Sequence, residues 1–363
     1  MRKSPLFLLA AFAIMLVSCK KNSVLSIKTY DVDYLNKTAD VYEGKNVMEI
    51  MGADNIIVFD TLIMVETNNP DGQLEIYSSN TMRHLGTFCK RGRARNEFFN
   101  TSCATEQCYY RNGHIILAMF DVNSEDLQNI IYTLKEVDIT ESLLRGSTVV
   151  LNADDCMSNS ETLVLGNDFG SRFQFELPLR YEQTDRILPR YTVINNGDSV
   201  DLKIFNKPME TMTQNKKLPY SGNIMKHPSR NLVVQSFDRM DYLLYMDIDA
   251  DNYFMVHQKG ALTFDDTYVG NRDMYQIVRF TEAAASSEYL MYLYRHGDYT
   301  LSTSHDEFYP ELLVFDWDGN YITGFKTNLS IHAIEYDEIH KVLYGLDRDN
   351  EILYAYDMSH LLS

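Results

Sequence analysis

Residues 311–325 read ELLVFD-WDGN-YITGF, which is the pattern of two β-strands joined by a tight turn. Apolar and aromatic residues fill both runs, and Asp318-Gly319 between them is a strong hairpin signal. The first half of the pattern, an apolar run that ends in a polar residue, recurs along the chain. Its copies are LEIYS (74–78), LKEVD (134–138), LLYMD (243–247), LLVFD (312–316) and ILYAYD (352–357).

The spacing of these copies predicts six similar units. The intervals between their last residues are 60, 109, 69 and 41, and the longest leaves room for one degenerate copy near Val200–Phe205. Units of roughly 55 residues lie within the size range of four-stranded β-propeller blades. Long amphipathic helical patterns are missing, and Thr281–Tyr289, with its three alanines, is the one candidate helix. We therefore predict an all-β, six-bladed β-propeller over residues 41–363.

The ends of this predicted propeller favour a closed ring. Only six residues follow Asp357, so the last blade lacks an outer strand. We expect Asn46–Met51, near the amino terminus, to supply that strand. Ring closure would also protect strand edges that otherwise invite aggregation.

The first residues predict export. Two basic residues precede an apolar run from Leu6 to Val17, which is too short to span a bilayer and typical of a secretory signal. The cysteine that ends the pattern resembles the lipobox of bacterial lipoproteins, in which cleavage precedes the cysteine and lipid is attached to its thiol. This resemblance predicts a signal peptide at 1–18, lipidation at Cys19 and a tether at 19–40. The alternative is an ordinary signal with a chance cysteine.

The charge of the chain argues against some partners. The formal net charge is −18, and removal of the two basic residues of the leader would bring it to about −20. Such a surface repels phosphate backbones and anionic headgroups, so nucleic acid is not an expected partner. A solvated acidic surface explains the charge, and a site for cations or sugars is the alternative.

Two segments resemble a known group of proteins. LGTFCKRGRARNEF (85–98) is similar to a glycine-rich loop in the six-bladed propeller lipoproteins of Bacteroidota, and ELLVFDWDGN (311–320) with LYGL (343–346) resembles the closing blades of the TolB-like propeller group. Ala94-Arg95-Asn96 replace the usual glycine and proline. The resemblance implies the fold and a lipid anchor in the outer membrane. The basic Lys20-Lys21 after the cysteine favours the periplasmic side.

One cluster of basic residues is a candidate binding site. Lys90, Arg91, Arg93 and Arg95 place four cations within six residues of an acidic chain. They could dock an anionic group or an acidic partner, because guanidinium groups suit carboxylate and phosphate. The other interpretation is an inter-blade loop whose arginines pair with neighbouring carboxylates and backbone carbonyls.

Other motifs are weak. Asp247–Asn252 resembles the start of a calcium loop, but Asn252 replaces the turn glycine and Gln258 the bidentate glutamate, so a hairpin turn is favoured. The nine histidines show no metal spacing, and we predict no metal site and no cofactor. Apart from the lipid-bearing cysteine, four cysteines remain, which form disulfides or stay free: Cys89, Cys103, Cys108 and Cys156.

Two functions remain open. An export signal joined to a repeat fold without a catalytic motif favours a binding or scaffold module for an envelope protein, peptide or glycan. The alternative is a hydrolase or lyase acting on sugars or peptides, with dispersed carboxylates that converge at one mouth of the propeller channel. Carboxylates or histidines within about 6 Å of one another there, with shifted pKa values, would favour the enzyme.

Overall fold

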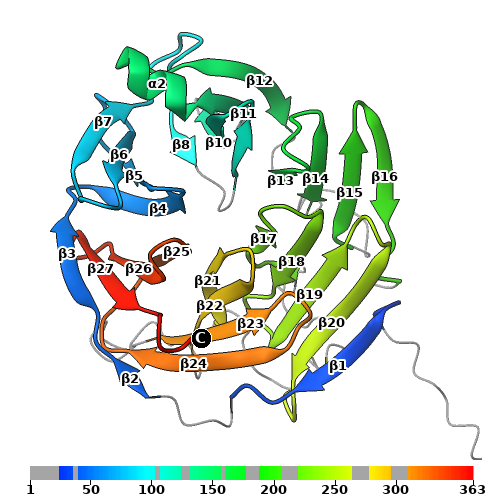
Figure 1. Ribbon diagram of the computed structural model, residues 1–363. Helices are drawn as coiled ribbons and strands as arrows, with labels where there is room; N and C mark the ends of the chain where they lie inside the picture. Colours follow the sequence, from blue (N-terminus) through cyan, green and yellow to red (C-terminus); the bar gives the residue numbers. More distant parts are fainter. Residues whose placement is uncertain are drawn as a thin grey trace, which may run out of the picture.

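The computed structural model describes residues 24–35, 40–102, 107–123, 131–156, 160–176, 188–206, 220–263, 278–295 and 310–362. Within these ranges the chain forms six β-sheets arranged around a common centre, which is a six-bladed propeller (Figure 1). The predicted fold class is therefore confirmed. Cys19, Cys103 and the predicted signal peptide lie outside the described residues.

Each blade begins with its innermost strand, and the chain then runs outward. Blade 1 contains β4 (Ala53–Phe59), β5 (Leu62–Thr67), β6 (Leu74–Ser78) and β7 (His84–Phe88). Blade 2 contains β8 (Thr101–Ser102), β9 (Cys108–Arg111), β10 (His114–Asn123), β11 (Ile131–Asp138) and β12 (Val150–Cys156). Blade 3 contains β13 (Ser160–Val164), β14 (Ser171–Glu176), β15 (Arg190–Asn195) and β16 (Asp198–Leu202).

Blades 4 to 6 also take up strands from the amino-terminal part of the chain. Blade 4 contains β17 (Ile224–Lys226), β18 (Leu232–Ser236), β19 (Tyr242–Asp247), β20 (Asn252–Gln258) and β1 (Lys28–Val32). Blade 5 contains β21 (Phe280–Ala285), β22 (Tyr289–Tyr294), β23 (Glu311–Asp316), β24 (Tyr321–Thr327) and β2 (Val41–Tyr42). Blade 6 contains β25 (Ala333–Asp337), β26 (Val342–Asp347), β27 (Ile352–Asp357) and β3 (Lys45–Glu49).

The five clear repeat copies are the third strands of five blades: β6, β11, β19, β23 and β27. The predicted position of the degenerate copy was wrong, because 200–205 covers the end of the fourth strand β16 and the third strand is β15. The predicted helix at Thr281–Tyr289 was also wrong. Its alanines lie in the innermost strand β21, where Ala284 is fully buried opposite Met291, and small side chains suit the region where the sheets converge.

One short helix, α2 (Ile139–Arg145), is present among the described residues and follows β11. Its amino terminus is capped by Asp138, whose carboxylate accepts a hydrogen bond from the backbone N–H of Glu141. Its carboxyl end is closed by Gly146 at φ 65°, a left-handed conformation that favours glycine. No helix in the described ranges is both long and apolar enough to cross a bilayer.

The ring is closed as predicted. Strand β3 pairs antiparallel with β27, with Met48 opposite Leu353 and Lys45 opposite Ala355. The backbone N–H of Ile50 then donates to the carbonyl of Glu351 at 2.8 Å. An amino-terminal strand therefore completes the carboxyl-terminal blade, which fixes the two ends of the propeller to each other.

The chain before β3 follows the outer edges of blades 4 and 5 (Figure 1). β1 and β2 add parallel strands to β20 and β24. Between them, Tyr34 is fully buried in the cluster that joins blades 4 and 5, where its ring packs edge-on against Phe315 at 5.3 Å. Residues 24–35 of the predicted tether are therefore packed on the propeller, and they cover a strand edge that would otherwise be exposed.

Candidate binding site at the start face of the propeller

The innermost strands all run in the same direction and so define two faces. We call the start face the one at which β4, β13, β21 and β25 begin, and the end face the one at which they end. The turns between second and third strands also lie at the start face. Residues from different blades therefore meet at its centre, although they are far apart in the sequence.

Arg348 joins three blades at the start face. It lies in the turn between β26 and β27 of blade 6, and its Nε donates to the backbone carbonyl of Asp54 in blade 1 at 2.5 Å. The same Nε lies 3.5 Å from the Asp54 carboxylate, and Nη2 lies 3.8 Å from the carboxylate of Glu282 in blade 5. These side chains remain partly exposed, so a ligand can reach the guanidinium and both carboxylates.

The turn that carries Arg348 is held by a buried carboxylate. Asp347 is 3% exposed and accepts hydrogen bonds from the backbone N–H groups of Asp349 and Asn350 and from the Asn350 amide. Such a network stabilises a single turn conformation. It accounts for the acidic hairpin sequence at 347–351, whose pattern by itself indicates only a turn.

Three carboxyl groups near this centre have raised pKa values. Burial raises the pKa of Glu282 to about 7, with Asp238 and Asp54 adding to the shift and Arg348 opposing it. Burial also raises the pKa of Glu161, at the start of β13, to about 7, again with a contribution from Asp238. Glu161 is nevertheless exposed to solvent, so a ligand in solution can reach its carboxyl group.

The charge of Asp238 contributes to the raised pKa of both glutamates. Asp238 lies in the turn between β18 and β19, and burial raises its pKa to about 6 against the effect of Arg239. Glu161, Asp238 and Glu282 belong to blades 3, 4 and 5. Groups that titrate between about 6 and 7 exist as both acids and bases near neutral pH, so they can donate or accept hydrogen bonds with a ligand.

His332 extends the cluster on the blade 6 side. Its Nδ1 accepts from the backbone N–H of Arg348 at 3.3 Å, so a neutral ring carries its proton on Nε2, which lies 3.6 Å from Asp349. Burial lowers the pKa of His332, which favours the neutral ring. Ligand atoms of His332, Asp347 and Asp349 lie within 4.8 Å of one another. The Asp347 oxygens already accept the hydrogen bonds of the turn, which favours a structural role for this group.

The predicted basic site lies on the loop between β7 and β8, which joins the outer strand of blade 1 to the innermost strand of blade 2. Lys90, Arg91, Arg93 and Arg95 are all exposed or partly exposed. Arg91 donates to the Asn100 side chain and Arg95 to the carbonyl of Leu151, both at 3.2 Å. The structure thus places all four on an inter-blade loop, while docking of an anionic partner stays a prediction.

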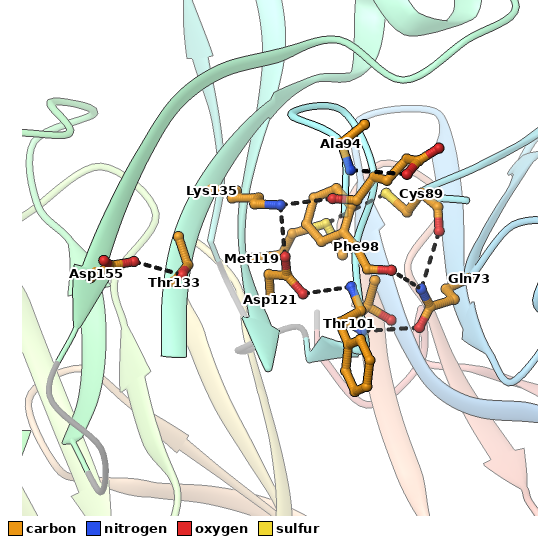
Figure 2. A network of polar contacts seen from close by, with 12 residues as sticks. Gln73, Cys89, Ala94, Phe98, Thr101, Met119, Asp121, Thr133, Lys135 and Asp155 are labelled. Atoms are coloured by element: carbon orange, nitrogen blue, oxygen red, sulfur yellow. Dashed lines mark hydrogen bonds and ion pairs between the residues drawn. The ribbon is translucent and has the colours of Figure 1, made fainter. Parts of the chain in front are cut away.

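The backbone of this loop is held from below by buried polar side chains (Figure 2). Gln73 is 2% exposed and donates to the carbonyls of Cys89 and Phe98. Lys135 donates to the carbonyl of Glu97 and to the Asp121 carboxylate, each at 2.7 Å, and lies 4.5 Å from the centre of the Phe98 ring. The loop therefore has a defined conformation, with its basic side chains on the outside.

The remaining candidates have structural roles. Asp247–Asn252 is the hairpin turn between β19 and β20, with the Asp247 carboxylate accepting from the backbone N–H of Ala250. Cys89, Cys108 and Cys156 are free thiols. Burial raises the pKa of the Cys89 and Cys108 thiols, which makes both poor nucleophiles.

No protein-family model and no curated protein matches the chain. Two solved structures of Bacteroides proteins share its fold. A DUF4221 family member from Bacteroides vulgatus is 8% identical over 88% of this chain and 96% of its own, with a TM-score of 0.55. A "putative exported protein" from Bacteroides fragilis is 9% identical over 91% of this chain and 99% of its own, with a TM-score of 0.50. At these identities the comparisons establish the fold alone.

Proposed function

We propose that the protein is an exported binding module of the cell envelope, with its ligand seated at the start face of the propeller. The observation that carries this proposal is the Arg348 cluster, in which blades 1, 5 and 6 place a guanidinium and two carboxylates at one accessible point. Neighbours of the same fold in Bacteroides, one of them described as exported, support a binding or scaffold role in the envelope.

The class of ligand follows from the combination of one guanidinium group and several carboxyl groups at the start face. Arg348 offers donors for carboxylate or carbonyl oxygen, while Glu161, Asp238 and Glu282 can accept from, or when protonated donate to, hydroxyl and amide groups. A ligand with many neutral polar groups fits this set better than a polyanion does. We therefore assign the site to a peptide or glycan, presented alone or on an envelope protein.

The anchor proposal follows from the amino-terminal sequence. Lipid on Cys19 would attach the protein to the outer membrane, and Lys20-Lys21 favours the periplasmic side. Val24 is already buried on the propeller, and only four residues separate it from Cys19, so the two residues are at most about 18 Å apart when the chain between them is extended. A lipidated Cys19 would therefore hold the edge of the propeller close to the membrane surface.

Binding to arrays of peptides and glycans tests this proposal. Wild-type protein is compared with Arg348→Gln, which removes the charge that links the blades, and with Arg83→Gln, an exposed arginine in the turn between β6 and β7. We expect a defined set of ligands whose binding is lost in Arg348→Gln and kept in Arg83→Gln. Equal binding by all three proteins, or binding of nucleic acid and polyanions only, would contradict the proposal.

The pKa values of Glu161 and Glu282 favour one second candidate, a hydrolase or lyase acting on sugars or peptides. A carboxyl group with a pKa near 7 can serve as a general acid near neutral pH. Turnover of an envelope polymer with a pH profile that falls above about 7, and its loss in Glu282→Gln, would support the enzyme. Binding without turnover in both proteins would support the binding module alone.

A further inference from the structure

A pocket of about 270 Å³ lies at the opposite, end face of the ring. Its walls come from the ends of the innermost strands of five blades, namely blades 1, 2, 4, 5 and 6. Ile57 and Phe59 of β4, Tyr336 of β25, and Pro228 provide an apolar surface. We call this the end-face pocket. It has no residue in common with the Arg348 cluster.

The polar groups of the end-face pocket are mainly acidic. Glu335 of β25 lines it and is 3% exposed, while Asp60 and Glu338 lie at its rim. Asp60 accepts a hydrogen bond from the Tyr110 hydroxyl at 2.8 Å, and Glu338 accepts from the backbone N–H of Ser287. These contacts orient the rim carboxylates without supplying a positive charge.

Arg230 and Lys226 lie on either side of the lining residue Pro228 in the sequence; neither lines the pocket, and Lys226 is 2% exposed. Its effect reaches the pocket at Cys108, a lining residue whose pKa Glu335 raises and Lys226 lowers. The described lining of the pocket thus carries three carboxylates and no lysine or arginine, in a chain whose formal charge is −18. An apolar cavity with a negative potential is complementary to an organic cation.

We propose that the end-face pocket binds a small organic ammonium ion with an aliphatic or aromatic stem. The ammonium group approaches Glu335 and the rim carboxylates, and the stem packs against the apolar walls. The volume has room for about nine water molecules at ~30 Å³ each, which limits the ligand to a comparable number of non-hydrogen atoms. This site is independent of the proposed function at the start face.

Calorimetric titration with matched probes tests the proposal. Phenethylamine is cationic at pH 7.5, 2-phenylethanol is a neutral compound of the same size, and benzoate is an anion with the same number of non-hydrogen atoms. We expect the amine to bind at least about tenfold more tightly than the alcohol, because its charge meets buried carboxylates, and we expect no binding of the anion. Glu335→Gln should weaken amine binding about tenfold and leave the alcohol unchanged.

Four further variants locate the binding. Glu49→Gln changes an exposed acid on the outer strand of the same blade and should have no effect. Glu282→Gln, at the start face, should also have none, which separates this pocket from the other site. Asp60→Asn and Glu338→Gln each remove one carboxylate at the rim and should weaken amine binding. These two variants provide the test if the Glu335→Gln protein does not fold. Amine affinity equal to that of the alcohol, undetectable amine binding, or amine binding unchanged in all pocket variants would overturn the proposal.

Discussion

Replacing Lys135 by Met should destabilise the loop between β7 and β8, which carries the four basic residues and which we call the basic loop. Methionine keeps the apolar stem against Phe98 but removes the ammonium that bonds to the Glu97 carbonyl and the Asp121 carboxylate (Figure 2). The Lys135 and Asp121 side chains are only 10% and 15% exposed, so water compensates poorly for the loss. The Asp121 carboxylate would still accept from the backbone N–H of Phe99 at 2.7 Å, but its charge would lack this ammonium partner.

The magnitude can be worked out from the ion pair and the hydrogen bond that Lys135 makes. Removing one partner of a buried ion pair costs about 3–5 kcal/mol. Because this pair is partly exposed, we expect the free energy of unfolding of the whole protein to fall by about 3 kcal/mol. The loop itself loses one charge-assisted hydrogen bond, worth about 1.5–3 kcal/mol. If the loop must open before a protease can cleave it, the loss of this hydrogen bond raises the population of the open loop roughly 10- to 100-fold.

Trypsin provides the assay, because the loop carries four cleavage sites between residues 90 and 95. Cleavage there, followed by mass spectrometry, should accelerate 10- to 100-fold in Lys135→Met. Lys259→Met, which changes an exposed lysine after β20, should leave the rate unchanged. Lys135→Met combined with Asp121→Asn should recover much of the stability, because the unpaired buried charge is removed. Cleavage rates within twofold of wild type would refute the reasoning.

Three further predictions concern the closure, the amino-terminal segment and the charged centre. The pair Lys45→Cys and Ala355→Cys, opposite each other in β3 and β27, should form a disulfide and raise the melting temperature; failure to oxidise would count against ring closure by β3. Tyr34→Ala should cost about 3–5 kcal/mol of unfolding free energy, measured by urea denaturation, whereas Tyr30→Ala, 44% exposed on β1, should cost far less; similar losses would show that Tyr34 is not a wedge between blades. Glu282 has a raised pKa, so the folded protein loses stability as pH rises from 4.5 to about 7 and bears the full cost above that; Glu282→Gln should therefore raise the melting temperature more at pH 8 than at pH 5, and an equal effect at both would contradict the shift.

The repeat could be predicted because each third strand carries its own signal. Leu312–Asp316 and its relatives combine a buried apolar run with a polar residue that starts a turn, and both parts are local. β15 was missed because Thr192 interrupts the apolar residues of RYTVIN, and because this strand ends in asparagine, whereas the five clear copies end in aspartate or serine. The alanines of β21 indicate a helix by propensity, but packing at the centre of the ring overrides it.

The charged centre could not be predicted from linear motifs. Asp54 and Arg348 are 294 positions apart and meet only because β3 closes the ring. His332 precedes β25 and contacts Arg348 and Asp349 in the turn between β26 and β27, whereas its nearest histidine in the sequence is His340. The basic loop was visible in the sequence because its four cations are neighbours in the chain. The buried side chains beneath it, such as Gln73 and Lys135, lie elsewhere in the sequence, and no local pattern connects them to the loop.

The most direct test of the binding site is a carboxyl titration by NMR with ¹³C-labelled glutamate. We predict that two glutamates titrate near pH 7, that one resonance disappears in Glu161→Gln and the other in Glu282→Gln, and that Arg348→Gln shifts the Glu282 transition to higher pH. Titration of both groups near their ordinary value of 4.5 would show that the start face does not enclose them, and it would contradict the site described above.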